Sequence, residues 1–427
     1  MHPNTPLTIT GPHPLTGEIH VQPSKNAALP IIVASLLSAE PVIIHGVPRL
    51  TDVETLMRIM EHLGTRFAWI GPHSITAHTP DVLSTTTPHD LVAKLRASIT
   101  LVGALTARTG EAHVGMPGGC TFSPRPVDQH LKSMRAIGVT VRDEAGVLHA
   151  ERHAPLKGRY LFDVQTVGGT QNAILAATLG AGSVTLENCS TDTDVVDMVN
   201  FLNTLGADIH GAGTSTIVVN GVKRLRGGEY TVIPDRLDAG TFMIAAVASR
   251  GHITLHNVIT NHLRAVTSKL QEIGATVLET DGRVITVDAR NHKLQAANVT
   301  ATEYPGFPTD LQPIIGALLT TVPGTSILTD RIYSRTSHVS ELIRMGANID
   351  MPEHTMVIHG STLHGANVTA ADIRSGGALI TAALAAEGET TIHGVQYLNR
   401  GYENLTARLT QLGVRVRAET NLPAAMD

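Results

Sequence analysis

The chain has 427 residues, 42% of them hydrophobic and 16% charged, which is typical of a well-packed soluble protein too long for a single core. A formal net charge of −5 excludes a global positive field that would attract nucleic acid or acidic membranes, so an anionic substrate requires a local basic cluster. Cys120 and Cys189 are the only cysteines, which excludes a disulfide framework and indicates a reducing compartment. The sequence has neither a signal-peptide pattern nor an apolar run of membrane-spanning length, so we expect a cytoplasmic protein.

A short motif occurs six times along the chain: an apolar residue, glycine, a small or β-branched residue, any residue, and another apolar residue. The copies begin at Leu63, Ile137, Leu205, Ile273, Met345 and Leu412. Their glycines are 74, 68, 68, 72 and 67 residues apart. Each copy is predicted to end an amphipathic helix, with the glycine just past its last turn, and to begin a strand.

An Ala-rich helical stretch followed by a strand also recurs in every repeat. The predicted helices cover residues 27–37, 97–107, 173–179, 242–248, 314–319 and 378–386. The predicted strands cover 42–44, 111–114, 183–186, 252–255, 326–328 and 390–392. Each repeat therefore reads strand, helix, strand, helix, strand, strand. Three such repeats make a domain of common size, so six predict two similar domains, whereas a solenoid uses shorter repeats.

The second repeat contains a loop at residues 116–128, where two glycines and three prolines exclude a regular helix or central strand. The apolar residues that follow recur at helical spacing: Val127, Leu131, Met134 and Ile137. The loop therefore leads into a helix whose first turn lies near residues 125–129. The thiol of Cys120, close to Arg125 and a helix N-terminus, suits chemistry on an anion. The alternative is that Cys120 is a small hydrophobe buried in a turn.

Eight segments, spread over essentially the whole chain, together resemble the enolpyruvyl transferases. They are residues 24–30, 95–98, 117–120, 125–128, 234–236, 307–310, 338–342 and 399–403. The resemblance implies an α/β fold of two inside-out, barrel-like domains, each built from three βαβαββ repeats. It implies a continuous domain of residues 25–235, which carries the Cys120 loop at about 115–126. The second domain is discontinuous and combines residues 1–24 with 236–427.

The resemblance also implies an activity. The segments are similar to those of family members that transfer the enolpyruvyl group of phosphoenolpyruvate to the 3′-hydroxyl of UDP-N-acetylglucosamine. That reaction releases phosphate and is the first committed step of peptidoglycan synthesis; no metal or organic cofactor takes part. Cys120 is then the general acid, which also forms a covalent phospholactoyl adduct, and we expect the epoxide fosfomycin to alkylate it.

For phosphoenolpyruvate, the resemblance implies contacts from Lys25 and Asn26 and from four arginines: Arg125, Arg335, Arg374 and Arg400. Arginine suits this task because its planar fork pairs bidentately with carboxylate and phosphate. Without the resemblance, Lys25 is as readily a solvated surface lysine, and each arginine alone is better interpreted as a surface residue. The catalytic group implied by the resemblance comprises Lys25, Cys120, Asp310 and Arg400.

Asp310 precedes a helix predicted to begin near Leu311, so the residues alone favour an N-cap role. By resemblance, Asp310 is instead the base that receives the proton of the sugar hydroxyl. The resemblance assigns the UDP-N-acetylglucosamine site to Arg96, Arg125, Pro126, Val127, Asp128, Gln129, Thr166, Val167, Gly168, Asp310 and Ile332. Of these, 166–168 precede a helix as a candidate anion nest, and Ile332 has the alternative interpretation of a strand core residue.

The sequence departs from the family pattern in four places, one of which is a segment after Tyr333 that is one residue shorter than usual. Phe122, Ser123 and Pro124 stand where small residues are usual, residues 192–194 read Asp-Thr-Asp instead of Glu-Pro-Glu, and Gln129 replaces a common leucine. Two rival functions stay open. A shikimate-phosphate enolpyruvyl transferase would carry Ser and Arg after the first lysine and would lack the loop cysteine. A non-catalytic protein that binds UDP-sugars would not require a thiol.

Overall fold

The computed structural model describes residues 5–118, 126–353 and 355–418. The chain forms two compact units. We call the stretch from Pro23 to Ile233 the inserted unit. The residues up to Gln22 together with those from Pro234 onward form the terminal unit.

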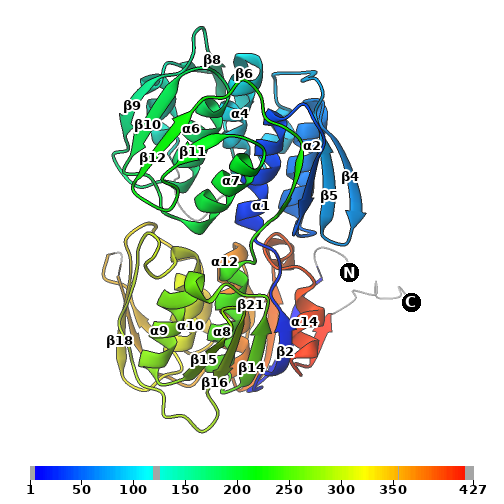
Figure 1. The fold of residues 1–427 in the computed structure, drawn as a ribbon. Helices are drawn as coiled ribbons and strands as arrows, with labels where there is room; N and C mark the ends of the chain where they lie inside the picture. The colour runs from blue at the N-terminus through cyan, green and yellow to red at the C-terminus, as the bar shows by residue number, and fades with distance from the viewer. Residues whose placement is uncertain (1–4, 119–125, 354, 419–427) are drawn as a thin grey trace, which may run out of the picture. The chain divides into compact units, whose positions relative to one another are not determined.

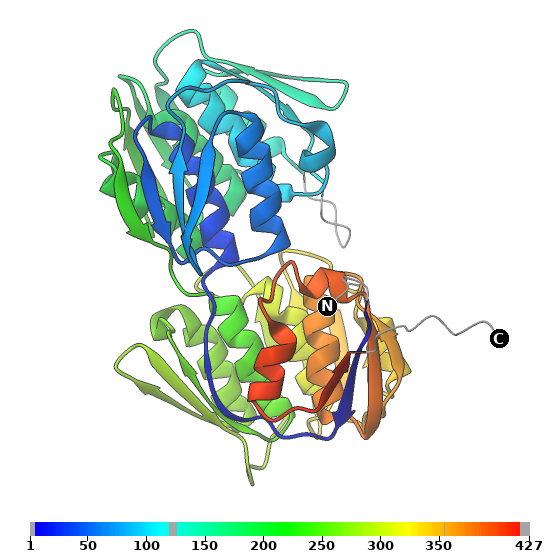
Figure 2. The ribbon, with the colours of Figure 1, turned by 90° about the vertical axis from the view of Figure 1, so that its right-hand side faces the viewer.

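In the inserted unit, three sheets surround buried helices (Figures 1 and 2). The sheets have the strand orders β13(Gly228–Thr231)-β3(Val42–His45)-β5(Ser74–His78)-β4(Arg66–Gly71), β6(Glu111–Gly115)-β8(Val147–Glu151)-β7(Thr140–Glu144), and β11(Asp208–His210)-β12(Thr216–Asn220)-β10(Ser183–Glu187)-β9(Gly158–Leu161). The central helices are α1(Lys25–Ala34), α4(Leu101–Thr109) and α6(Val167–Thr178), and α4 packs against both others. The outer helices are α2(Thr51–His62), α5(Asp128–Ala136) and α7(Thr193–Thr204).

The terminal unit repeats this plan. Its sheets have the strand orders β15(Thr276–Thr280)-β16(Val284–Asp288)-β14(His252–His256)-β2(Thr16–His20), β17(Val299–Ala301)-β18(Thr325–Asp330)-β20(Thr355–His359)-β19(Asn348–Asp350), and β21(Asn367–Thr369)-β22(Gly388–His393)-β1(Leu7–Gly11)-β23(Val416–Ala418). The central helices α8(Arg236–Ala248), α10(Gln312–Leu319) and α12(Ile373–Ala385) contact one another. The outer helices are α9(Arg264–Ile273), α11(Val339–Arg344) and α14(Leu405–Gln411).

The same pairing recurs in every four-stranded sheet: one parallel edge pair is followed by two antiparallel pairs. In the β6 sheet the parallel strand is reduced to an isolated bridge between Thr86 and His113. The prediction of two helices and four strands per repeat is therefore confirmed, with this one strand shortened. Strands are also exchanged between repeats, because β13 pairs with β3 whereas β2 pairs with β14.

The repeated glycines have the predicted conformation. All six have positive φ, from +90° at Gly413 to +111° at Gly64 and Gly274, a region that glycine enters without steric cost. At Gly274, an added Cβ would lie 2.8 Å from the carbonyl oxygen of Lys293. The positive φ thus favours glycine at all six helix ends, and at Gly274 the space requires it as well.

Small residues in the central helices allow close packing. The backbone N–H of Gly103 in α4 donates to Asn172 Oδ1 in α6 (2.8 Å). A Cβ on Gly103 would lie 2.3 Å from the Asn172 carbonyl oxygen, closer than any side chain permits.

Candidate active site

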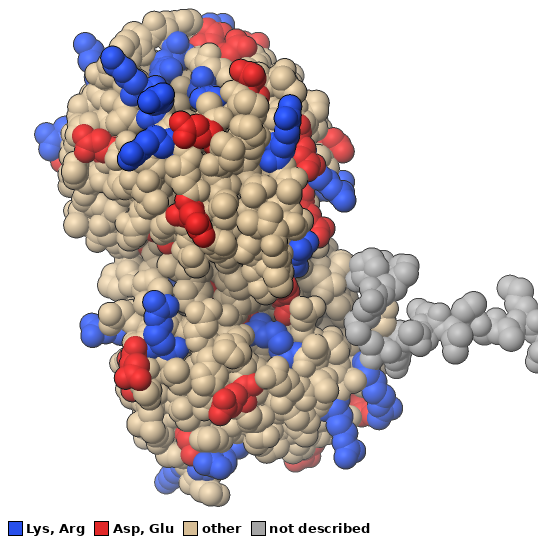
Figure 3. All heavy atoms as spheres, turned by 45° about the vertical axis from the view of Figure 1, so that its right-hand side comes forward, with Lys and Arg blue, Asp and Glu red and all other residues tan. Residues whose placement is uncertain are grey.

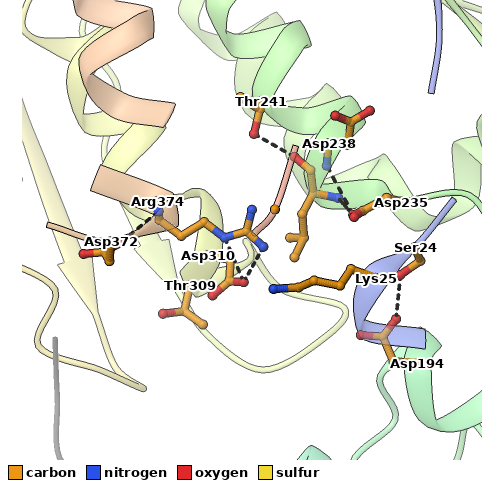
Figure 4. Close-up of polar contacts among 12 residues, drawn as sticks. Ser24, Lys25, Asp194, Asp235, Asp238, Thr241, Thr309, Asp310, Asp372 and Arg374 are labelled. Carbon is orange, nitrogen blue, oxygen red and sulfur yellow. Dashed lines mark hydrogen bonds and ion pairs between the residues drawn. The ribbon is translucent and has the colours of Figure 1, made fainter. Parts of the chain in front are cut away.

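Asp310 lies at the centre of a charged cluster in the terminal unit (Figure 4). Its carboxylate accepts a hydrogen bond from Arg335 Nη2 and two more from Arg374, through Nε (3.1 Å) and Nη2 (2.8 Å). The arginine side chains are only 3% and 7% exposed, so the alternative interpretation of Arg335 and Arg374 as surface residues is wrong. Guanidinium groups that bind the Asp310 carboxylate are also suited to bind a carboxylate or phosphate group of a ligand.

The predicted N-cap role of Asp310 is wrong. Thr309–Leu311 forms a 3₁₀ turn before α10, and the N-cap positions of the turn and of α10 fall on Pro308 and Leu311. Neither position makes a side-chain cap hydrogen bond. The carboxylate of Asp310 is directed to Arg335 and Arg374 because a charged pair outweighs a single backbone N–H.

A second carboxylate, Asp330, supports this cluster from the end of β18. Thr309 donates to Asp330 Oδ2 (2.6 Å) and receives a hydrogen bond from Arg335 Nε (3.2 Å). Asp330 Oδ1 accepts the backbone N–H groups of Ile332 (2.9 Å) and Tyr333 (3.1 Å), and burial raises its pKa. Ile332 is thus a half-buried turn residue beyond the strand, so the alternative of a strand core residue is wrong.

Arg374 occupies the first turn of α12. The N-cap residue Asp372 accepts from the backbone N–H groups of Arg374 (2.8 Å) and Ser375 (3.0 Å), and Ser375 completes a capping box. Burial disfavours the Arg374 charge, but Asp310, Tyr402 and Asp235 together outweigh this effect and raise the pKa of Arg374. Arg400 follows the short helix α13(Val395–Leu398) and is half-buried.

In the inserted unit, Lys25 is the first residue of α1 and is buried. Ser24 caps the helix by accepting the backbone N–H of Ala27 (3.2 Å). Lys25 Nζ lies 3.0 Å from Asp52 Oδ2, and the two side chains are 9% and 8% exposed. The alternative of a solvated surface lysine is therefore wrong. Asp52, on α2, was not predicted, because no local pattern links residues this far apart.

The Asp-Thr-Asp departure also contributes to this region. Asp192 caps α7 by accepting the backbone N–H of Asp194 (3.1 Å). Ser24 Oγ donates to Asp194 Oδ1 (3.4 Å), a contact drawn in Figure 4. The shorter aspartate therefore still reaches the residue that caps α1, immediately before Lys25. Asn26 is half-buried in the first turn of the same helix.

Helices α5 and α6 contact each other, and the predicted nucleotide-binding residues Asp128, Gln129, Val167 and Gly168 lie in their first turns. Asp310 and Ile332 lie in the terminal unit. Arg96 Nη2 donates to the carbonyl oxygen of Pro126 (3.2 Å), next to Val127 and Asp128. Thr166 caps α6, which begins at Val167, by accepting the backbone N–H of Gly169 (3.3 Å). The first residues of α6 are half-buried, and the helix contacts the turn Arg96–Thr100, so its N-terminus and a basic side chain lie in one region, an arrangement that favours phosphate groups.

His130 joins these two helices and was missed by the sequence analysis. Asn172 Nδ2 donates to its Nδ1 (3.2 Å), and a Cβ on Gly168 would lie 3.1 Å from its Cε1. Burial, helped by the nearby Arg96 charge, lowers the pKa of His130 to about 3. The imidazole ring is therefore neutral at neutral pH, and the missing side chain at Gly168 allows its close approach. Its position two residues after the matched segment 125–128 was a signal in the sequence.

Gln129, which replaces the common leucine, is held by four hydrogen bonds within the protein. Its Nε2 donates to Asp128 Oδ2 and Asp163 Oδ2, both at 2.8 Å. Its Oε1 accepts from Tyr160 Oη and the Asp163 backbone N–H, both at 3.1 Å. The polar atoms of Gln129 therefore fix Asp128 relative to strand β9 and the turn after it.

Cys120 and Arg125 lie outside the described residues, as do Phe122, Ser123 and Pro124. The other cysteine, Cys189, is fully buried, and burial raises its pKa to about 12. Within the described ranges, we find no helix that combines the length and apolar character needed to cross a bilayer. On the face drawn in Figure 3, basic and acidic side chains are interspersed, in keeping with the small net charge.

Comparison with known proteins places this geometry in one family. Residues 9–409 match the family model of EPSP synthase (3-phosphoshikimate 1-carboxyvinyltransferase). The UDP-N-acetylglucosamine 1-carboxyvinyltransferases of Deinococcus deserti and Deinococcus radiodurans are 57% and 58% identical over 424 residues, which is 99% of this chain and of theirs. That of Thermus thermophilus is 50% identical over 411 residues, 96% of each chain.

Solved structures share the fold. The enolpyruvyl transferase NikO from Streptomyces tendae matches with a TM-score of 0.87 and 24% identity, covering 97% of this chain and 98% of its own. EPSP synthase from Acinetobacter baumannii matches with a TM-score of 0.73 and 18% identity, covering 97% and 100%. The chain belongs to the enolpyruvyl transferases and, within them, to the UDP-N-acetylglucosamine 1-carboxyvinyltransferase family. The predicted fold class is thereby confirmed.

Proposed function

We propose that this transferase moves the enolpyruvyl group of phosphoenolpyruvate to the 3′-hydroxyl of UDP-N-acetylglucosamine in peptidoglycan synthesis. In the addition step, the sugar oxygen bonds to C2 of phosphoenolpyruvate, loses its proton to a base, and C3 gains a proton. In the elimination step, the C2–phosphate oxygen bond breaks and a C3 proton leaves. The observation that carries the proposal is the Asp310 carboxylate held between buried Arg335 and Arg374, in a chain of this family.

The roles follow from the chemistry of each group. Asp310 receives the proton of the sugar hydroxyl, because its two arginines orient the carboxylate. Cys120 protonates C3 and forms the covalent phospholactoyl adduct. The cationic residues hold the phosphoenolpyruvate carboxylate and phosphate, with Asn26 as a polar contact: Lys25, Arg125, Arg335, Arg374 and Arg400.

The nucleotide is bound chiefly around the first turns of α5 and α6. Arg96 and the α6 N-terminus neutralise the diphosphate. The residues proposed to contact UDP-N-acetylglucosamine are Arg96, Arg125, Pro126, Val127, Asp128, Gln129, Thr166, Val167, Gly168, Asp310 and Ile332. We further infer a cytoplasmic enzyme whose domains comprise residues 25–235 and residues 1–24 with 236–427.

Phosphate release tests this function. We expect phosphate release only when phosphoenolpyruvate and UDP-N-acetylglucosamine are both present, because the first is the donor of the enolpyruvyl group and the second is its acceptor. The control replaces the nucleotide sugar with shikimate 3-phosphate, the acceptor of the rival branch. Equal release with that acceptor would contradict the assignment.

Fosfomycin tests the role assigned to Cys120. We expect a single covalent adduct by intact mass, formed faster with UDP-N-acetylglucosamine present and absent in Cys120→Ala. The described thiol, Cys189, is protected because it is buried and its pKa is raised to about 12. A Cys189→Ala variant should therefore label like the wild type, and an adduct mapped to Cys189 would refute the assignment.

A further inference from the structure

Gln22, which lies outside the eight family segments, makes two hydrogen bonds to the backbone of the segment that carries Arg400. Its side-chain Nε2 donates to the Gly401 carbonyl oxygen (2.9 Å), and its Oε1 accepts the Glu403 backbone N–H (2.8 Å). The side-chain NH₂ group of Gln22 faces a carbonyl oxygen and its side-chain oxygen faces an N–H group, so a flipped side-chain amide is excluded. Gln22 is 6% exposed; its hydrogen bond to Gly401 is buried and the one from Glu403 is partly buried.

The base of Gln22 is itself rigid. Its backbone N–H donates to Asp238 Oδ2 (3.3 Å), and its carbonyl oxygen accepts the Asp235 backbone N–H (2.9 Å). Asp238, whose side chain is fully buried, receives two hydrogen bonds of 2.7 Å from Arg408. The backbone of Gln22 is thus hydrogen-bonded to the N-terminal end of α8, one of the central helices, and this holds its side-chain amide in place.

Other contacts also hold this segment: the backbone N–H of Arg400 donates to the Tyr397 carbonyl oxygen (3.2 Å), and those of Gly401 (2.9 Å) and Tyr402 (2.8 Å) donate to the Leu398 carbonyl oxygen. The Tyr402 ring is 2% exposed, and its hydroxyl lies 3.0 Å from Thr241 Oγ1. A Cβ on Gly401 would lie 2.4 Å from Ile373 Cγ2, so the backbone there touches the start of α12. These contacts fix residues 401 and 402 from one side. The Gln22 amide fixes the peptide groups on both sides of Tyr402, and so sets the direction in which the chain leaves Arg400.

We propose that Gln22 is a positioning residue for Arg400: it holds the backbone next to this arginine so that the guanidinium is preorganised for phosphoenolpyruvate. The inference rests on the proposed function, which gives Arg400 its anion. Preorganisation matters because an arginine on a loosened segment must lose conformational freedom on binding. Gln22 acts through the backbone of its neighbours and does not itself contact the substrate.

The test replaces Gln22 with methionine, which keeps the length and volume of the side chain but removes both hydrogen bonds. The matched control is Gln271→Met, which removes an amide that donates to the Val277 carbonyl oxygen (3.2 Å) elsewhere in the terminal unit. For Gln22→Met, we expect the KM for phosphoenolpyruvate to rise about fivefold to twentyfold, with the KM for UDP-N-acetylglucosamine changed less than about twofold. For Gln271→Met, we expect neither constant to change.

Two further readouts separate positioning from a general loss of structure. Hydrogen exchange of a peptide covering residues 399–405 should accelerate in Gln22→Met, because the Glu403 N–H loses its acceptor, while peptides from α10 stay unchanged. In an Arg400→Lys background, the Gln22→Met change should add little to the KM for phosphoenolpyruvate, because coupled residues are not additive.

The outcomes are distinguishable. If the wild-type protein releases no phosphate, the proposed function fails, and the exchange experiment still reports on the grip of Gln22. If the wild type is active but Gln22→Met has the same KM values as Gln271→Met, the positioning role is refuted. Full additivity with Arg400→Lys would also refute it. Should Gln22→Met fold poorly, Gln22→Leu provides the same comparison.

Discussion

Asp310→Asn is expected to lower turnover by roughly 10²–10⁴ and also to destabilise the terminal unit. The amide cannot accept the hydroxyl proton, and the substitution removes the carboxylate charge that pairs with both buried guanidinium groups. Loss of one partner of such a buried cluster costs about 3 kcal/mol. Steady-state phosphate release and thermal melting measure the two effects.

The matched control for this variant is Glu389→Gln, which removes an exposed pair with Arg417 in the same unit. An exposed pair of this kind contributes less than about 1 kcal/mol, so melting and turnover should change little. If Asp310→Asn kept both the activity and the melting temperature of the wild type, the carboxylate would have neither the catalytic nor the electrostatic role described.

Lys25→Gln is expected to have the second largest effect. Turnover should fall by roughly 10²–10³, because a cation that stabilises developing charge in a buried site is lost. The Asp52 carboxylate, 8% exposed, would lose its cationic partner, so the inserted unit should also become less stable by about 3 kcal/mol. Melting and single-turnover kinetics measure the two losses separately.

The double variant Lys25→Gln with Asp52→Asn distinguishes structure from catalysis. Removing both charges should recover part of the lost stability, because no uncompensated charge remains buried. It should not recover turnover, because the cation is still absent. Recovery of activity in the double variant would mean that Lys25 serves only to neutralise Asp52.

Local signals in the sequence predicted the repeats well. A glycine directly after an amphipathic helix indicates a helix end with positive φ, and all six repeated glycines have positive φ. The Ala-rich stretches became the buried central helices because small side chains allow close approach, as Gly103 shows against Asn172. The exchange of β2 and β13 between sheets leaves no local signal, since each strand keeps the pattern of its own repeat.

The site was harder to predict, because its determining contacts are distant in sequence. Asp310 has the local pattern of a helix cap, yet its carboxylate pairs with Arg374, 64 residues away. The burial of Lys25 depends on Asp52, 27 residues away. The grip of Gln22 on Gly401 joins residues 379 positions apart. Residue type alone indicated which side chains carry chemistry, but their protein partners came only from the fold.

The most direct measurement of the central claim is the structure of the product. The protein would be supplied with UDP-N-acetylglucosamine and phosphoenolpyruvate labelled with carbon-13 at C2 and C3, and the product examined by nuclear magnetic resonance. We expect a labelled vinyl ether whose C2 couples through oxygen to the proton at C3′ of the sugar, with one phosphate released per product. Labelled pyruvate with unchanged nucleotide sugar, or a vinyl ether on another hydroxyl, would contradict it.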